Sequence, residues 1–259
     1  MSYGNQFKAH TQLKLSPFFE RTSRLNESQE WRRWSGYLAA TNYELTHENE
    51  YFAIRTKAAL LDITPLYKYI IEGPDAQRFL NRMVTRNIGI CKVGQVMYTP
   101  WCDEDGKQID DGTVQRLSDH KFRITSAEPN LEWIEYNAAG MDLSILDDSY
   151  ATAALAIQGP NSRTILNTVT SDILNNLKFF WMMETRFGDI PVSISRTGYT
   201  GDLGYEIWMD SKDALSVWDL LMDKGKPFGI TPTGLQALDM ARIEAGLILL
   251  DVDYISSRH

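Results

Sequence analysis

The stretch that decides the fold is Ser195-Arg-Thr-Gly-Tyr-Thr-Gly-Asp-Leu-Gly-Tyr-Glu-Ile-Trp208. Its glycines are spaced by three, which permits positive φ angles and a close approach of the backbone. Strand-like segments flank it, whereas a dinucleotide-binding loop lies between a strand and a helix. The stretch therefore predicts a hairpin tip that carries Tyr199 and Glu206. An ordinary tight hairpin with a solvated glutamate is the alternative.

A second segment, Tyr98-Thr-Pro-Trp-Cys-Asp-Glu-Asp-Gly-Lys-Gln-Ile-Asp-Asp-Gly-Thr-Val114, predicts another hairpin with its turn at 103–106. Symmetric pairing about that turn sets Tyr98 opposite Asp111, while Asp110 points to the other face. Aspartate is uncommon inside strands, so at least one of the pair is expected to point inward and to need partners or a chemical role. An edge strand with solvated carboxylates and a calcium loop are the alternatives, but later residues do not continue the calcium pattern.

Composition and charge exclude several function classes. The net charge of -8 argues against a nucleic-acid partner, and Trp31-Arg32-Arg33-Trp34 is too short for a basic footprint. No apolar run approaches the roughly 20 residues of a membrane span. The 2 cysteines and 4 scattered histidines predict neither a disulfide framework nor a metal site, so a cytoplasmic location is expected.

Helices and strands are mixed along the chain, and many strands appear in hairpins, which predicts the α+β class. Helices are expected at 28–40, 48–59, 128–138, 211–224 and 231–249. Strands are expected at 60–63, 96–102, 108–117, 121–126, 143–146, 191–197 and 205–209.

An internal sequence repeat, here called the internal echo, adds two further units, each of which is a strand, a Gly-Pro turn and a helix. Ile71-Glu-Gly-Pro-Asp75 and Ile157-Gln-Gly-Pro-Asn161 stand 86 positions apart, and each leads into a helix with Asp75 or Asn161 as the expected cap. Two lobes on one plan would explain the echo, and chance is the alternative.

Together the two hairpin segments resemble the glycine-cleavage T-protein (aminomethyltransferase) family and its folate-dependent demethylase branch. The family carries a Tyr before a turn, an apolar-Asp-Asp triplet, and later S-R-T-G-Y-T-G-x-x-G-[YF]-E, matched here by Tyr98, 109–111 and 195–206. Supporting matches are 61–63, the two Gly-Pro helices and 242–246, so the similarity covers roughly 48–250. It implies two mixed lobes of mainly antiparallel sheet with flanking helices, the aminomethyltransferase folate-binding fold.

The resemblance also implies tetrahydrofolate as cofactor and Asp111 as the catalytic carboxylate near its reacting nitrogens. The expected folate-binding residues are Tyr98, Leu66, Thr113, Ser126, Tyr199 and Glu206, and no metal is expected.

Leu66, Ser126 and Leu238 depart from the glycine-cleavage pattern, which has Met, Asn and Arg there. These departures indicate that recognition of the donor or of the folate tail has changed. They favour a transferase that moves a methyl or aminomethyl group from a small-molecule donor onto tetrahydrofolate. A glycine-cleavage enzyme acting on a lipoyl carrier, and a non-catalytic folate-binding or regulatory protein, are the alternatives.

The expected domain organisation is an N-terminal arm at 1–30 followed by a folate-binding module at 31–259. Within the module, one lobe is expected at about 64–150, inserted into a second lobe made of 31–63 and 151–259. The family's C-terminal barrel of about a hundred residues is expected to be absent, which adds an inactive module as a further alternative.

Overall fold

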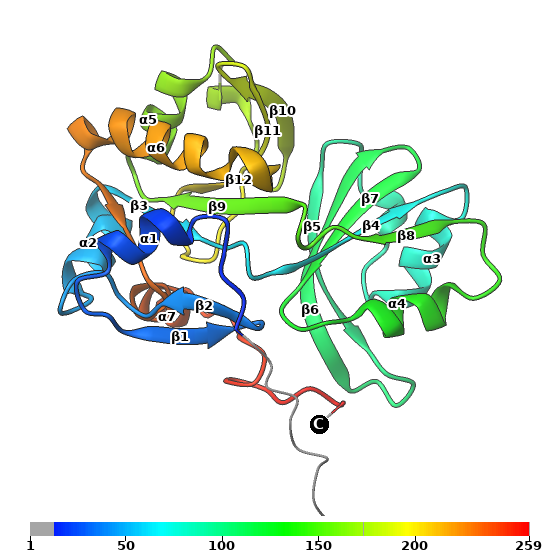
Figure 1. The fold of residues 1–259 in the computed structure, drawn as a ribbon. Helices are drawn as coiled ribbons and strands as arrows, with labels where there is room; N and C mark the ends of the chain where they lie inside the picture. The colour runs from blue at the N-terminus through cyan, green and yellow to red at the C-terminus, as the bar shows by residue number, and fades with distance from the viewer. Residues whose placement is uncertain (1–12, 173, 259) are drawn as a thin grey trace, which may run out of the picture.

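The structure is a computed structural model that describes residues 13–172 and 174–258. Figure 1 shows strands and helices gathered into two lobes that lie side by side. Within the described residues, every strand pairing between named strands is antiparallel except that of β3 with β13, and helices flank the sheets. The predicted α+β class is confirmed.

The larger lobe is built on a six-stranded sheet of the described chain. Its order is β10 (Met182–Phe187), β11 (Ile190–Ser195), β12 (Gly204–Asp210), β9 (Thr152–Gln158), β3 (Ala58–Asp62) and β13 (Ile230–Pro232).

Side chains of β9 alternate between the two faces of this sheet, as the pleat requires. Leu155 and Ile157 join the core under α5 (Ser162–Val169) and α6 (Ala214–Gly225). The intervening Ala154 and Ala156 face the side of α2 (Glu48–Thr56) and α7 (Leu235–Glu244). The small side chains of these alanines leave space on the face of the sheet that α7 covers, and the cavity described below lies on that face.

The smaller lobe is built on a five-stranded sheet. Its order is β5 (Val96–Cys102), β6 (Gln108–Ser118), β7 (Lys121–Ser126), β4 (Tyr67–Glu72) and β8 (Ser144–Asp147). α3 (Ala76–Met83) and α4 (Leu131–Ala138) cover one face, where Phe79, Trp101 and Phe122 are fully buried. Figure 1 shows β5 and β6 on the side that faces the larger lobe.

Both copies of the internal echo fold as predicted, β4 into α3 and β9 into α5. Gly73 and Gly159 each have a positive φ at the turn. The expected side-chain caps are wrong. The carboxylate of Asp75 accepts from Arg78 and from the backbone N–H of Asp142, and Asn161 donates its side-chain amide to the carbonyl of Phe228.

The helix predicted at 28–40 is wrong. The segment forms a hairpin of β1 (Trp31–Trp34) and β2 (Tyr37–Ala40). Its two turn residues, Ser35 and Gly36, both have positive φ angles, the geometry that joins strands with a two-residue loop. The local Ser-Gly turn therefore favours a hairpin over the predicted helix.

The helix predicted at 231–249 is too long. Ile230–Pro232 is β13, which pairs parallel with β3, and α7 occupies only Leu235–Glu244. Gly246 has a φ of 70° just after the helix, so the chain leaves the helical direction there. β10 was also not predicted. The strands at 96–102 and 121–126 match their predicted bounds, and the remaining elements lie within a few residues of the expected ones.

Residues 1–12 of the predicted arm lie outside the described residues. The following residues include α1 (Phe19–Leu25), and Phe18 is buried in the core of the larger lobe beside Trp218. The predicted domain boundaries, with one lobe at about 64–150 inserted into the other, stay a prediction. No described helix combines the length and apolarity that crossing a bilayer requires.

Candidate functional site

A cavity of about 830 Å³ lies between the α7 side of the large sheet and the β5–β6–β7 part of the small sheet. It is lined by residues from both lobes, including Trp208 of β12 and Thr125 of β7. The sequence-predicted site residues all line this one cavity: Leu66, Tyr98, Asp111, Thr113, Ser126, Tyr199 and Glu206. The fold thus brings together residues that are up to 140 positions apart in the chain. Their individual roles stay predictions.

The predicted register of the β5–β6 hairpin is wrong by two residues. Tyr98 pairs with Thr113, and Asp111 pairs with Pro100. One residue of the shift arises at the turn, where Cys102 pairs with Gln108 and not with Lys107, and the bulge at Trp101 and Cys102 adds the second. A shift by two preserves the alternation of faces, so Tyr98 and Asp111 still point the same way as diagonal neighbours.

Asp111 presents its carboxylate to the cavity and is held by a residue from the far end of the chain. Its Oδ1 accepts a hydrogen bond from the hydroxyl of Tyr254 and a longer one, 3.4 Å, from the side-chain amide of Gln108. Burial raises the pKa of Asp111, and hydrogen bonds from Tyr254 and Tyr98 act in the opposite direction. The result is a partly buried carboxylate whose protonation is sensitive to its two phenol neighbours.

Asp110 points into the small lobe, as expected for the other face of the hairpin, and is fully buried. Its carboxylate accepts from the backbone N–H groups of Asp111 and Glu128 and from the side-chain amide of Asn130. Burial raises the pKa of Asp110 to about 6. These three donors tie β6 to the loop before α4, so Asp110 is structural and the neighbouring Asp111 is left for the cavity.

The remaining small-lobe candidates are held by short local contacts. The hydroxyls of Thr113 and Thr125 lie 2.8 Å apart, and Ser126 donates to the carbonyl of Glu128 at 2.7 Å. The carbonyl of Leu66 accepts from the buried ammonium of Lys68 at 2.9 Å. These contacts fix the cavity wall.

The glycine-rich loop, residues 196–203 between β11 and β12, closes over the side chain of Gln158. That side chain donates to the carbonyls of Thr197 and Tyr205 and accepts from the hydroxyl of Thr200. A Cβ atom on Gly198 would stand 2.6 Å from its Nε2. Gly198 and Gly204 are therefore explained by the passage of one buried amide beneath the loop, whereas Gly201 has a positive φ and lies against Ala245.

The loop delivers Tyr199 to the cavity, and β12 delivers Glu206. The Tyr199 hydroxyl donates to the carbonyl of Ile248. The carboxylate of Glu206 accepts from the hydroxyl of Thr197 at 2.7 Å, and burial raises its pKa. A partly buried carboxylate with one oxygen on a threonine is suited to accept hydrogen bonds from a ligand with N–H donors.

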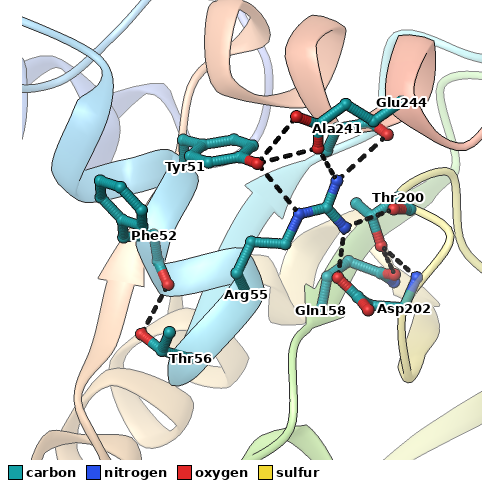
Figure 2. A network of polar contacts seen from close by, with 9 residues as sticks. All are labelled: Tyr51, Phe52, Arg55, Thr56, Gln158, Thr200, Asp202, Ala241 and Glu244. Atoms are coloured by element: carbon teal, nitrogen blue, oxygen red, sulfur yellow. Dashed lines mark hydrogen bonds and ion pairs between the residues drawn. The ribbon is translucent and has the colours of Figure 1, made fainter.

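Arg55 of α2 fastens the same loop to α7 (Figure 2). Its guanidinium donates to the carbonyl of Thr200 at 3.0 Å, and it forms ion pairs with Asp202 and Glu244. Tyr51 lies beside it and donates to Glu244 at 2.8 Å. Arg55 does not line the cavity. Its contacts instead hold the loop that carries Tyr199 against α2 and α7.

Sequence reasoning missed Tyr254, the role of the Gln158 side chain, Thr197 and Arg55. Tyr254 lies just beyond residues 48–250, where the motifs carried the resemblance, and no local pattern links it to Asp111. Gln158 precedes the second copy of the recurring Gly-Pro unit. Thr197 lies two residues after Ser195, which pairs with Glu206, so alternation predicts Thr197 on the same face of the hairpin as Glu206. Of the four missed residues, only Thr197 could have been predicted from sequence, by alternation along the hairpin of β11 and β12.

In the described part of the chain, no group of three or more His, Cys, Asp or Glu side chains is arranged to hold a metal ion.

Comparison with known proteins gives a consistent result. The model of the GCVT N-terminal domain matches residues 18–258. The chain is 39% identical to a trimethylamine-oxide aldolase of Ruegeria pomeroyi, over 93% of this chain and 32% of that protein. It is 36% identical to an aminomethyltransferase of Halothermothrix orenii, over 95% of this chain and 69% of that protein.

A solved structure, the glycine cleavage system aminomethyltransferase T of Bartonella henselae, superposes with a TM-score of 0.81 at 26% identity. The match covers 92% of this chain and 64% of that one. The chain thus spans between about a third and about two thirds of the length of these relatives.

Proposed function

The chain belongs to the GCVT N-terminal domain family, and from that membership we propose that it transfers a methyl or aminomethyl group from a donor to tetrahydrofolate. The observation that carries the proposal is one cavity with Asp111 on the small-sheet wall and Glu206 on the large-sheet wall. Two partly buried carboxylates of this kind are expected to bind and to act on a ligand that is rich in nitrogen.

The residues present fit a folate. Glu206 offers carboxylate oxygen to the N–H donors along the amide-like edge of a pterin, and Tyr98 and Tyr199 offer aromatic faces for its ring. A cavity of about 830 Å³ is within the range of cofactor sites. Tetrahydrofolate would supply the nitrogen nucleophile that accepts the one-carbon unit.

Asp111 has the chemistry of a proton acceptor. For the transfer to balance, the donor fragment would leave with the electron pair of the broken donor–carbon bond and take up a proton, and the acceptor nitrogen would lose one. Asp111 would accept that proton on its carboxylate, and its charge would stabilise positive charge that develops nearby. Burial that raises its pKa makes it a better base than a solvated aspartate. Alignment of both reactants in one cavity would supply the remainder of the rate enhancement.

The donor that we propose first is a small N-, O- or S-methylated compound. Leu238, which stands where glycine-cleavage members have a charged Arg, contributes apolar surface to the cavity together with Leu66. The name of the Ruegeria pomeroyi relative, trimethylamine-oxide aldolase, supports a small methylated amine derivative. An aminomethyl group on a lipoyl carrier is the second candidate, supported by the relatives named aminomethyltransferase.

Binding and single-turnover transfer together test the proposal. Tetrahydrofolate binding would be titrated by fluorescence on wild type and on Asp111→Asn, and transfer would be followed with methylated amines, methyl ethers, methyl thioethers and an aminomethylated lipoyl carrier. We expect wild type to bind and transfer, and Asp111→Asn to bind but to lose about 10²- to 10⁴-fold in rate.

Three outcomes contradict the proposal at different points. Equal transfer by both proteins excludes a proton-transfer role for Asp111. Binding without transfer from any donor favours a folate-binding or regulatory protein. Absence of binding by wild type excludes a folate function for this chain.

A further inference from the structure

After α7 the chain does not stay with the larger lobe. Residues 247–258, here called the C-terminal strap, line the cavity with Leu247 to Val252 and then reach β6 of the smaller lobe. Ser256 donates its hydroxyl to the carbonyl of Ile109 at 2.7 Å, and the backbone N–H of Ser257 donates to the carbonyl of Gln108 at 2.9 Å. Figure 1 shows this red segment leaving the foot of the larger lobe and ending below β6 of the smaller lobe.

The strap carries Tyr254 to the catalytic carboxylate. Its ring is partly buried, and its hydroxyl donates to Oδ1 of Asp111. We propose that Tyr254 is a positioning residue for the transfer: its hydroxyl holds Oδ1 of Asp111, fixes the orientation of the carboxylate at the cavity wall, and stabilises the carboxylate anion. The inference rests on the proposed function, because it assigns Tyr254 to the reaction that Asp111 serves.

Tyr254 is placed to remain a donor. Burial and the neighbouring carboxylate of Asp111 raise the pKa of its phenol, so it keeps its proton at neutral pH. A phenol that stays protonated can only donate to a carboxylate, and such a charge-assisted bond stabilises the anion. The effect on Asp111 opposes the effect of burial, which by itself favours the neutral acid.

Other titratable groups around Asp111 come from every neighbouring element. Asp110 adjoins it on β6, Tyr98 lies across the hairpin on β5, and Tyr199 approaches from the glycine-rich loop. Further charged groups line the same cavity: Arg32, Arg33, Arg86, Glu128, Glu206, Asp239 and Asp251. Because Tyr98 also bonds to Asp111 and Gln108 donates to it at 3.4 Å, removal of the Tyr254 hydroxyl leaves these two donors in place.

The strap has anchors that do not involve this hydroxyl. Asp253 forms an ion pair with the buried Arg242 and accepts from the backbone N–H of Leu249 at 2.8 Å. Ser256 and Ser257 hold the other side. Tyr254→Phe is therefore expected to leave the strap in place while it removes the bond to Asp111.

The test compares wild type, Tyr254→Phe and Ser256→Ala. Ser256→Ala is the matched control, because it removes a strap anchor on β6 and leaves the Asp111 contact intact. The pH profile of kcat/KM and the titration of the Asp111 carboxyl, followed by ¹³C NMR with labelled aspartate and assigned with Asp111→Asn, are measured on each protein.

For Tyr254→Phe we expect the acidic limb of the profile and the carboxyl titration to move up by about one pH unit. For Ser256→Ala both should stay within about 0.3 unit of wild type, since loss of a neutral hydrogen bond changes stability and not the charge on Asp111. A Tyr254→Phe titration that coincides with wild type overturns the inference, and so does an equal displacement in Ser256→Ala. If wild type shows no folate activity, the proposed function fails, yet the carboxyl titration still decides the role of Tyr254.

Discussion

The side-chain amide of Gln158 occupies the space that a Cβ atom on Gly204 would need. The same amide also excludes a Cβ atom at Gly198, and neither glycine has a positive φ. These two glycines are therefore required by packing and not by backbone conformation. The glycine-rich loop and β9 form one unit, which holds Tyr199 and Glu206 in the cavity wall.

Gly204→Ala is expected to destabilise the protein by about 1–3 kcal/mol, because the added methyl group overpacks against Gln158. The free energy of unfolding would be measured in urea for Gly204→Ala, Gln158→Ala and the double variant. In the Gln158→Ala background the added methyl group has room, so its cost should fall by at least about 1 kcal/mol. Equal costs in both backgrounds would show that Gln158 is not what excludes the side chain.

Arg55→Lys is expected to lower the free energy of unfolding by about 1 kcal/mol. Lysine keeps the charge but cannot contact the Thr200 carbonyl, Asp202 and Glu244 together, as the guanidinium does. The loss is modest since both carboxylates are partly exposed. Arg78→Lys is a matched control, because Arg78 pairs with Asp75 on the surface and joins no second element. A cost at Arg55 no larger than the cost at Arg78 would contradict the linking role seen in Figure 2.

Asp110 is expected to make the protein more stable as the pH falls from neutral. Its pKa is raised to about 6 by burial, so the native state binds its proton more tightly than the unfolded state. This contribution is complete below about pH 4, the ordinary pKa of an aspartate, and is lost as the pH rises through about 6. Urea unfolding of wild type and Asp110→Asn between pH 4.5 and 7.5 measures it.

The difference in stability between wild type and Asp110→Asn should therefore grow toward low pH. Asp110→Asn should also be destabilised throughout, because asparagine presents a donor where Asp110 accepts from Glu128 and Asn130. A constant difference across this range would contradict the raised pKa.

Glu206→Gln is expected to weaken tetrahydrofolate binding at least about tenfold, equivalent to about 1.4 kcal/mol, because a neutral amide loses a charge-assisted acceptor for the pterin N–H groups. Binding would be measured by isothermal titration, with circular dichroism as the check on folding. Asp210→Asn is the matched control, since Asp210 ends the same strand, is exposed and lies outside the cavity. Unchanged affinity in Glu206→Gln, or an equal loss in Asp210→Asn, would remove Glu206 from the binding site.

Much of the fold could be predicted from sequence because short-range signals agreed with it. The Gly-Pro units predicted the strand-to-helix turns at Gly73 and Gly159, and residue alternation predicted most strands. The helix predicted at 28–40 is wrong because the Ser35-Gly36 turn favours a two-residue loop that joins β1 to β2. β13 was hidden because a three-residue parallel strand depends on β3, which is far away in sequence.

The sequence by itself determined the α+β class, the family, and the separation of Asp110 from Asp111 by face, because alternation along a strand survives a register shift of two. Only the tertiary structure decided which carboxylate is structural. The donors to Asp110 come from the loop before α4, and the hydroxyl on Asp111 comes from Tyr254, 143 positions away. The passage of Gln158 beneath Gly198 and Gly204 was likewise a matter of packing between distant segments. Such contacts depend on how whole helices and strands pack together, and the local sequence pattern does not predict that packing.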